Sequence, residues 1–318
     1  MLTIGSFDGM HCGHIEIIKE LIKKAGENKC PSIVITFNPH PKCILHKNVN
    51  EKWNVLMEID KKLDIFEQYQ IDYVWLIPFD EDFAHISADK FLDSYIMKYF
   101  NPTDIVVGYD HHFGHKRKGD IKFLNNQKAR YNYNLYVKDP ITINNMPVNS
   151  TIIRNYLSQG KLEAANNYLG WDYELCGRVV KGKGVGKDMK FPTANIEPNF
   201  DNQLIPAKGV YCVDVIIENQ FYLGMCNIGV RPTFYTNGEE MIEVHLISDE
   251  DLILYDKDIK IIFKKFIRKL IKDISGEKFK NRINFKYITP DNNWMFLNDK
   301  KRKMKTYLLF DKFLILKN

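Results

Sequence analysis

Two kinds of hydrophobic pattern divide the chain. Up to about residue 170, short apolar runs alternate with segments whose apolar positions recur every three or four residues. Such runs are typical of buried strands, and such segments are typical of amphipathic helices. Strands that alternate with helices predict a parallel, Rossmann-like sheet in an α/β fold. We expect strands at 2–7, 31–37, 73–77, 104–107 and 137–143, and helices that begin near 15, 59, 88 and 150.

From Tyr173 onward, apolar and polar residues alternate instead. Short strands separated by turn residues, with no helical segments between them, predict a small antiparallel β-barrel. A chain of 318 residues is long enough for two domains. We therefore expect an α/β domain at 1–172 and a β domain at 173–318. The expected strands of the second domain are 173–180, 209–215, 221–226, 241–246 and 259–263.

The last fifty residues, 269–318, have the weakest pattern. Segments 294–297 and 307–310 are apolar enough to pack or to pair as strands. Residues 300–303 have the sequence Lys-Lys-Arg-Lys, which is typical of a solvated face and also of a site for an anionic partner.

Composition and charge narrow the class of protein. Hydrophobic residues make up 45% of the chain and charged residues 27%, as in ordinary soluble proteins. A net charge of +5 suits phosphorylated small molecules but gives no reason to expect nucleic acid. The six cysteines include no Cys-x-x-Cys pair, and no apolar run reaches the ~20 residues of a membrane helix. We expect a cytoplasmic protein without a signal peptide, membrane or nucleic-acid partner, acting on small molecules as a monomer or weak homo-oligomer.

The stretch Gly5-Ser-Phe-Asp-Gly-Met-His-Cys-Gly-His14 holds the strongest candidate chemistry. It lies where the first strand turns into the first helix, and free N–H groups with a positive dipole end make such a place a phosphate site. His11 and His14 add side-chain donors, and Gly9 and Gly13 allow backbone and ligand to approach closely. Two histidines three residues apart are also typical of a surface pair or half of a metal site.

Three other candidate sites in the first half follow strands or open a helix. Residues 36–41, Thr-Phe-Asn-Pro-His-Pro, form a polar loop after a buried strand, where α/β sheets place ligands. The glycines and basic residues of 108–120 include Arg117, whose planar fork suits phosphate. Ser150 or Thr151 is the expected N-cap of a helix with Arg154 one turn in, which indicates either a second anion site or plain capping.

The second half carries a glycine-rich basic loop, 182–190, between its first strand and the sequence Phe-Pro-Thr-Ala-Asn. Such a loop can wrap phosphates with its N–H groups, and it is equally typical of a flexible hairpin. Thr193 and Asn195 offer oxygen ligands suited to Mg²⁺. Glu243 alone would be an outward-facing strand residue, although a carboxylate can also assist an alcohol that attacks a γ-phosphate.

Taken together, these strings resemble the bacterial bifunctional riboflavin kinase/FAD synthetases. Residues 5–14 are similar to the His-x-Gly-His motif of nucleotidylyltransferases in the form found in that family. Residues 36–41, 108–119 and 149–154 resemble further segments of the adenylyltransferase half, and 191–195, 227–233 and 243–246 resemble segments of the kinase half. The departures from the family pattern are His111, Asn149, Lys187, Lys190, Asp256 and the tail after Arg268.

The resemblance implies a Rossmann-like nucleotidylyltransferase domain followed by a riboflavin-kinase-like β-barrel. It implies phosphorylation of riboflavin to FMN with ATP and Mg²⁺, and adenylylation of FMN to FAD with release of pyrophosphate. Two alternatives remain: an adenylyltransferase with a weakened kinase domain, and a non-catalytic flavin-binding regulatory protein.

The same resemblance assigns roles to particular residues. Those expected at the adenylyltransferase ATP are Gly5, Phe7, Gly9, His11, His14, Ser150, Thr151 and Arg154, with His11 and His14 catalytic. Those expected at its flavin are Asn38, His40, Asp110 and Arg117. In the kinase, Gly182, Gly184, Gly186, Lys187, Thr193 and Asn195 are expected at ATP, with Thr193 and Asn195 on Mg²⁺ and Glu243 as the base.

Overall fold

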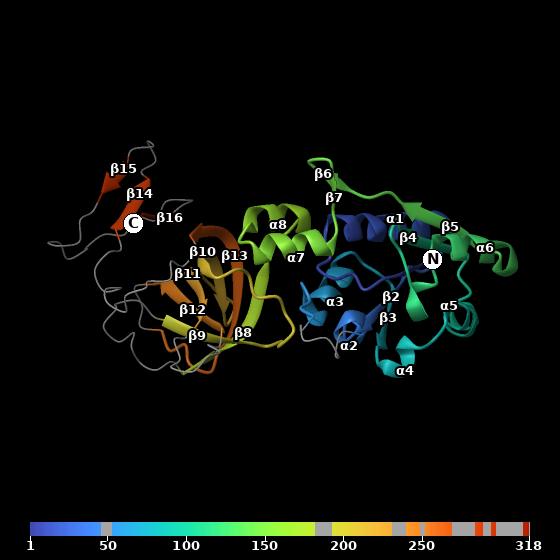
Figure 1. The fold of residues 1–318 in the computed structure, drawn as a ribbon, viewed down its shortest axis with the longest axis horizontal. Coiled ribbons are helices and arrows are strands. Elements are labelled where there is room, and N and C mark those ends of the chain that lie inside the picture. Colours follow the sequence, from blue (N-terminus) through green and yellow to red (C-terminus); the bar gives the residue numbers. More distant parts are fainter. Residues whose placement is uncertain are drawn as a thin grey trace. The chain divides into compact units, whose positions relative to one another are not determined.

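The structure is a computed structural model of the 318-residue chain. It describes residues 1–45, 53–181, 193–230, 240–248, 252–268, 284–288, 294–296 and 314–317. The chain forms two compact units, and a short segment from the second half of the sequence returns to the first unit. The first unit is Met1–Leu175 with Pro198–Ile205, and the second is Cys176–Glu197 with Pro206–Asn318 (Figure 1).

A five-stranded parallel sheet forms the centre of the first unit, in the order β3-β2-β1-β4-β5. In β1, Leu2 pairs with Ile33 on one side and with Ile105 on the other. The strand order therefore reverses beside β1, which is where open α/β sheets bind ligands. The strands are β1 Leu2–Ile4, β2 Ile33–Asn38, β3 Tyr73–Pro78, β4 Asp104–Gly108 and β5 Asn134–Lys138.

Helices cover both faces of this sheet, because alternate strand residues face opposite sides. Val34 packs in one core with Ile18 of α1 and Phe66 of α3. Its neighbour Ile35 packs in the other core, with Phe91 of α5. The helical segments are α1 Cys12–Asn28, α2 Pro41–Leu45, α3 Ile59–Gln68, α4 Glu81–Ala84, α5 Ala88–Phe91, η1 Leu92–Met97, η2 His115–Arg117, α6 Ile121–Tyr131, α7 Ser150–Ser158 and α8 Leu162–Leu169.

The strand expected at 137–143 is wrong in its position. The structure has β5 at Asn134–Lys138, and then a small hairpin of β6 Thr142–Ile143 and β7 Met146–Pro147. Asn144 and Asn145 form the hairpin turn with φ of 52° and 61°. Asparagine tolerates this left-handed backbone, so the chain reverses at residues that the apolar pattern treated as the end of a longer strand.

The expected N-cap at Ser150 or Thr151 is also wrong. Asn149 caps α7, because its side-chain oxygen accepts a hydrogen bond from the Ile152 N–H at 2.9 Å. Asparagine is as good a cap as serine, and the earlier of the adjacent candidates takes the position. Helix α7 ends at Ser158, and α8 follows it after Gly160, which has a φ of 73°.

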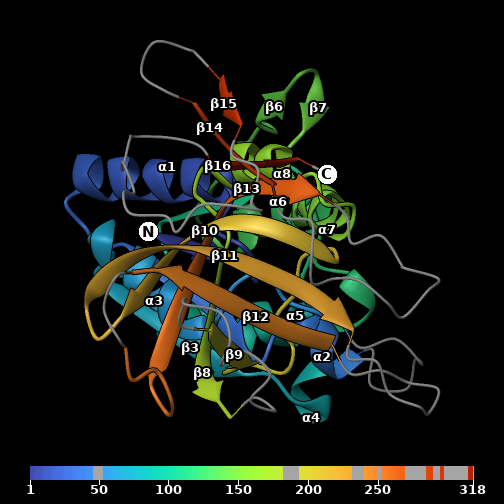
Figure 2. The ribbon, with the colours of Figure 1, turned by 90° about the vertical axis from the view of Figure 1, so that its left-hand side faces the viewer.

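The second unit contains a closed six-stranded barrel in the order β10-β11-β12-β9-β8-β13, which confirms the predicted barrel (Figure 2). In β12, Ile242, Val244 and Leu246 are buried in its interior, while the residues between them lie on the other face. The sequence predicted no strand between 180 and 209, and the structure has β9 there, at Thr193–Pro198. The strands are β8 Glu174–Val180, β9 Thr193–Pro198, β10 Gly209–Ile217, β11 Gln220–Val230, β12 Glu240–Ile247 and β13 Asp258–Arg268.

Three further strands, β14 Asn284–Ile288, β15 Trp294–Phe296 and β16 Leu314–Lys317, form a small sheet of their own. The strand expected at 294–297 is thus found at Trp294–Phe296, whereas 307–310 and the basic cluster 300–303 lie outside the described residues. Within the described parts of the chain, no helix has the length and apolar character needed to cross a bilayer.

Candidate active sites

The loop after β1 takes an unusual path into α1. Gly9 has a φ of 82°, and a Cβ there would come within 2.9 Å of Leu56 Cδ1. A side chain at this position would therefore meet both backbone strain and a clash. Phe7 also has a positive φ of 47°, and the Met10 N–H donates to the Phe7 carbonyl at 3.3 Å. The loop thereby turns sharply enough to place His11 at the start of α1.

His11 and His14 form a stacked pair, with ring centroids 3.6 Å apart and planes at 17°. His11 caps α1, because its Nδ1 accepts a hydrogen bond from the backbone N–H of His14 at 3.3 Å. A neutral His11 must then carry its proton on Nε2. The Nδ1 atom of His14 is buried and has no hydrogen-bond partner among the described residues. The pair can therefore offer N–H donors to a ligand.

Both imidazoles are neutral at pH 7. Burial lowers the pKa of His11 to about 4 and holds the pKa of His14 well below its usual range, with the His11 ring as a second cause for His14. An anion placed beside the rings would favour their charged forms and raise both pKa values. This electrostatic setting suits a site that receives phosphate.

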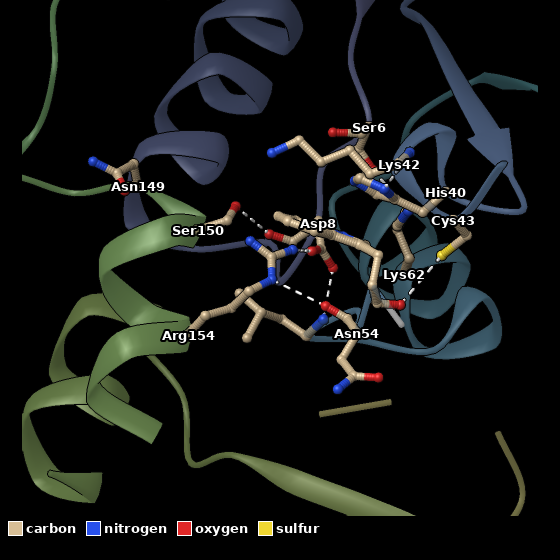
Figure 3. Close-up of polar contacts among 12 residues, drawn as sticks. Ser6, Asp8, His40, Lys42, Cys43, Asn54, Lys62, Asn149, Ser150 and Arg154 are labelled. Atoms are coloured by element: carbon tan, nitrogen blue, oxygen red, sulfur yellow. Dashed lines mark hydrogen bonds and ion pairs between the residues drawn. The ribbon is translucent and has the colours of Figure 1, made fainter. Parts of the chain in front are cut away.

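Asp8 joins the histidine loop to α7, as Figure 3 shows. Its side chain is 4% exposed and forms an ion pair with Arg154, while its second oxygen accepts from the Leu56 N–H at 2.8 Å. The Ser150 hydroxyl donates to the Asp8 carbonyl oxygen at 2.9 Å. Arg154 also donates from Nε to the Asn54 carbonyl at 3.0 Å, so its guanidinium is fixed from two sides.

The structure thus brings together His11, His14, Ser150 and Arg154, as the sequence analysis expected. Asp8 was assigned no role there, because its partner lies 146 residues away. Thr151 is exposed in the first turn of α7.

Lys62 on α3 was missed as well. Its side chain is nearly buried, at 4% exposed, and its Nζ donates to the Ser6 carbonyl at 2.8 Å. Burial lowers the pKa of Lys62 to about 8, against the opposing effect of Asp8. A signal was present in the sequence, since Lys62 lies three residues after Ile59 and four before Phe66, inside the apolar stripe of the helix.

In a second part of this site, several side chains pack against the ring of Trp53. The His40 ring stacks on it at 6.3 Å, and Lys42 Nζ and the Arg154 guanidinium lie 4.0 and 4.4 Å from its ring centroid. Burial lowers the pKa of His40 to about 4. Burial also lowers the pKa of Lys42, with Arg154 and Arg117 as further causes. The described site therefore carries several cations around Asp8, which favours an anionic ligand.

The remaining expected residues of the first unit differ in what they can contact. Asn38 and Asp110 are exposed at the end of β2 and just after β4, whereas Arg117 is exposed in η2 with a φ of 59°. Phe7 is 2% exposed and packs edge-on against Phe66 and His14, so its ring belongs to the core. The Gly5 N–H is already bonded to the Ile35 carbonyl at 3.0 Å.

His111, which replaces an aromatic residue of the family pattern, packs with its ring centroid 5.6 Å from that of Phe113. Burial lowers the pKa of His111 to about 4, so it packs there as a neutral ring. The substitution therefore keeps an aromatic contact at this position.

The barrel carries a row of polar side chains on its outer face. Glu243 lies directly opposite Asn195 of β9 and Asn227 of β11 in the strand register. The Asn227 Oδ1 is buried without a hydrogen-bond partner among the described residues, and His245 Nε2 lies 3.9 Å from Glu243 Oε2. Burial lowers the pKa of His245, against the effect of Glu243.

Several expected kinase residues cannot be placed. Gly182, Gly184, Gly186 and Lys187 lie outside the described residues, and of Thr193 only the backbone is described. Within the described part of the chain, no three His, Cys, Asp or Glu side chains group closely enough to hold a metal ion by themselves.

Comparison with known proteins covers both halves of the chain. Residues 1–152 match the family described as FAD synthetase, and 169–287 match the family described as riboflavin kinase. A protein from Buchnera aphidicola subsp. Schizaphis graminum, named bifunctional riboflavin kinase/FMN adenylyltransferase, is 32% identical, with 89% of this chain and 90% of that protein covered. A protein of the same name from Haemophilus influenzae is 33% identical at the same coverage.

Among solved structures, one described as a macrolide-efflux protein from Streptococcus pneumoniae has the same architecture. It superposes with a TM-score of 0.74 at 28% identity, and the match covers 86% of this chain and 88% of that one. The two sequence families therefore fall on the two halves of the chain that differ in fold.

Proposed function

This chain belongs to the family of bifunctional riboflavin kinases/FMN adenylyltransferases, and we propose that its two domains divide the two reactions between them. The protein phosphorylates riboflavin to FMN and adenylylates FMN to FAD, with ATP as the second substrate of both steps. We assign the adenylyl transfer to 1–172 and the phosphoryl transfer to 173–318. The protein acts on small molecules in the cytoplasm, as a monomer or weak homo-oligomer that binds no nucleic acid.

In adenylyl transfer, a phosphate oxygen of FMN attacks the α-phosphorus of ATP, and the bond to pyrophosphate breaks. No protein nucleophile is needed, so the protein must align the two phosphates and offset their charge. We place the ATP phosphates at His11, His14, Ser150, Thr151 and Arg154, with backbone contacts from Gly5, Phe7 and Gly9. The flavin is placed at Asn38, His40, Asp110 and Arg117.

One observation carries this assignment: two buried, neutral imidazoles stack at a helix start beside Arg154, which Asp8 and the Asn54 carbonyl hold in place. Donors fixed before the ligand arrives need no reorganisation during the reaction.

In phosphoryl transfer, the primary hydroxyl of the ribityl chain attacks the γ-phosphorus of ATP, and ADP leaves. Glu243 accepts the hydroxyl proton, since a carboxylate within hydrogen-bond reach assists such an attack. Gly182, Gly184, Gly186 and Lys187 are proposed to bind the ATP phosphates.

The donors on this face suit Mg²⁺, because Asn195 and Asn227 place carboxamide groups on both sides of Glu243, and the oxygen of Asn227 is buried without a partner among the described residues. Thr193 and Asn195 would hold the ion, which neutralises phosphate charge when bound.

A chromatographic assay of riboflavin, FMN and FAD tests this division. With riboflavin and Mg-ATP, the wild-type chain should form FMN and then FAD. With His14→Ala the conversion should stop at FMN, because the rate of FAD formation should fall by about 10²-fold or more. Glu243→Gln should make FAD from supplied FMN but form little FMN from riboflavin, and the two variants mixed should again make FAD from riboflavin.

The outcomes separate the alternatives. Failure of the wild-type chain to phosphorylate riboflavin, with FAD still formed from FMN, would identify an adenylyltransferase with an inactive kinase domain. Formation of neither product would leave a flavin-binding regulatory protein. An unchanged rate in His14→Ala would contradict the proposed phosphate site.

A further inference from the structure

Lys62 is a buried cation whose charge the described residues do not balance. Its Nζ has one hydrogen bond among them, to the Ser6 carbonyl at 2.8 Å. Asp8 is the carboxylate that acts on it most clearly, yet Asp8 already accepts from Arg154 and from the Leu56 N–H. No carboxylate of the described residues forms an ion pair with Lys62, so the ammonium is held by a neutral carbonyl.

Such an arrangement opposes folding. A buried ammonium loses hydration, which is why the pKa of Lys62 falls from 10.5 to about 8. At pH 7 the group is still charged, and the folded state binds its proton less tightly than the unfolded chain does. A methionine would fill the same space between Ile59 and Phe66 without this penalty. Packing alone therefore gives no reason for a lysine.

The position of the ammonium indicates what the charge does. Ser6 immediately precedes Phe7, where the backbone turns with a φ of 47° toward the histidine pair. The positive charge of Lys62 also contributes to the lowered pKa values of His14 and His40, although burial is the larger cause. In Figure 3, Lys62 lies on the same side of Asp8 as His40. The charge thus acts on the two parts of the proposed phosphate site.

We propose that Lys62 is a positioning residue for adenylyl transfer, fixing the Ser6–His11 loop through the Ser6 carbonyl and placing a positive charge beside His14 for the ATP phosphates. The inference rests on the proposed function of the first unit. It extends that function to a residue outside every motif by which the sequence resembles the family.

The test compares Lys62→Met, which keeps the length of the side chain without its charge, with Lys62→Arg, which keeps a charge. Lys122→Met is the matched control, because Lys122 is an exposed lysine on another helix, α6. For Lys62→Met we expect kcat/KM for ATP in FAD formation to fall at least about tenfold, since a displaced loop misaligns the phosphates. The KM for FMN should stay within about twofold, and Lys62→Arg should recover at least about threefold of the loss.

Two further readouts exclude a purely structural role. FMN formation by the same Lys62→Met chain should stay within about twofold of wild type, and its Tm should be equal or higher because a buried charge has been removed. A lower Tm with loss of both reactions, or an unfolded variant, would show that Lys62 serves packing and would overturn the proposal. FAD formation by Lys62→Met within about twofold of that by Lys122→Met would also overturn the proposal.

His14→Ala, measured in parallel, separates the two claims. If His14→Ala loses FAD formation while Lys62→Met does not, the phosphate site stands and the role of Lys62 is rejected. If neither variant loses it, the proposed function of this site fails as well.

Discussion

Asp8 is the residue on which the geometry of the first site depends. It forms an ion pair with Arg154 of α7 and accepts hydrogen bonds from the Ser150 hydroxyl and the Leu56 N–H. One residue thus connects segments that are far apart in the sequence. Because the Asp8–Arg154 pair is buried, removal of either charge would leave the other buried and unpaired, which is destabilising. We propose that the same arginine binds phosphate, so stability and binding should be coupled at this residue.

Substitutions at this pair should separate the two effects. Arg154→Met should lower the free energy of unfolding by about 3–5 kcal/mol, because it leaves the Asp8 carboxylate buried and unpaired. Adding Asp8→Asn should restore part of that stability without restoring FAD formation. Urea unfolding followed by circular dichroism measures the first effect, and the chromatographic assay measures the second. Full stability in the single variant would contradict the ion-pair argument.

The stacked histidines should make the fold sensitive to acid. Burial holds the pKa of His11 near 4, below its ordinary value of 6.5, so between these pH values the unfolded chain binds a proton that the folded chain does not. Stability should therefore fall as the pH is lowered from 6.5 toward 4, by up to about 1.4 kcal/mol per pH unit for each such histidine.

Urea unfolding at pH 7, 6 and 5 measures this slope. His11→Asn is the control, because asparagine can cap α1 but does not titrate in this range. A slope that is the same in wild type and His11→Asn would contradict the assignment to His11.

At the scale of single residues, the sequence is informative where chemistry is concentrated in a short string. His11, His14 and Arg154 could be singled out because each lies at a recognisable helix start. Asp8 could not be assigned a partner, since a contact across 146 residues leaves no local pattern. Trp53 follows a segment without periodicity, and its contacts with Lys42 and Arg154 arise only from folding.

At the scale of elements, α7 places Ser150 and Arg154 in the site, and the residue before it, Asn149, fixes where the helix begins. The Asn149 side chain accepts from the Ile152 N–H and so determines where the helix begins. Asn149→Ala should lower the stability of the fold by about 1 kcal/mol and raise the KM for ATP in FAD formation. Asn149→Ser should have little effect on either.

Thermal unfolding together with the chromatographic assay measures these effects. An alanine variant with an unchanged KM would show that α7 needs no cap to hold Arg154.

The elements themselves were predictable where an apolar period was clear. The strands β2, β3 and β4 lie within two residues of their expected bounds and α3 begins at Ile59 as expected, since each has a continuous or regularly spaced apolar face. Helix α6 was not expected, because Leu124 is its one buried side chain and its other apolar residues do not recur with a clear helical period. Strand β9 was not predicted, because its first residues belong to the Pro-Thr-Ala-Asn string, which was interpreted as part of a ligand-binding segment.

At the scale of the whole molecule, the return of Pro198–Ile205 to the first unit is the feature that no sequence pattern indicated. Its backbone pairs with Val55, which donates to the Asn202 carbonyl at 2.7 Å and accepts from Leu204 at 2.9 Å. The Tyr173 hydroxyl donates to the Leu204 carbonyl at 2.6 Å. These bonds fix the segment next to Leu56, whose N–H donates to Asp8.

Leu204 should therefore matter for FAD formation although it lies in the kinase half of the sequence. Leu204→Ala removes a buried side chain and should destabilise the first unit by about 2 kcal/mol or more. After heating to increasing temperatures, the variant should lose FAD formation before FMN formation. Ile261→Ala, which removes a fully buried side chain of the barrel, should show the opposite order. Loss of both reactions together in Leu204→Ala would contradict the division into units.

The same return segment limits how such a protein could be separated into two independent genes. A break before β8 would give a first product that lacks Pro198–Ile205, a segment that belongs to the first unit. A break after Ile205 would take β8 and β9 away from the barrel and leave it open. Because every single breakpoint in this region divides at least one of the two units, the units are interleaved within one gene, and both can be inherited intact only together.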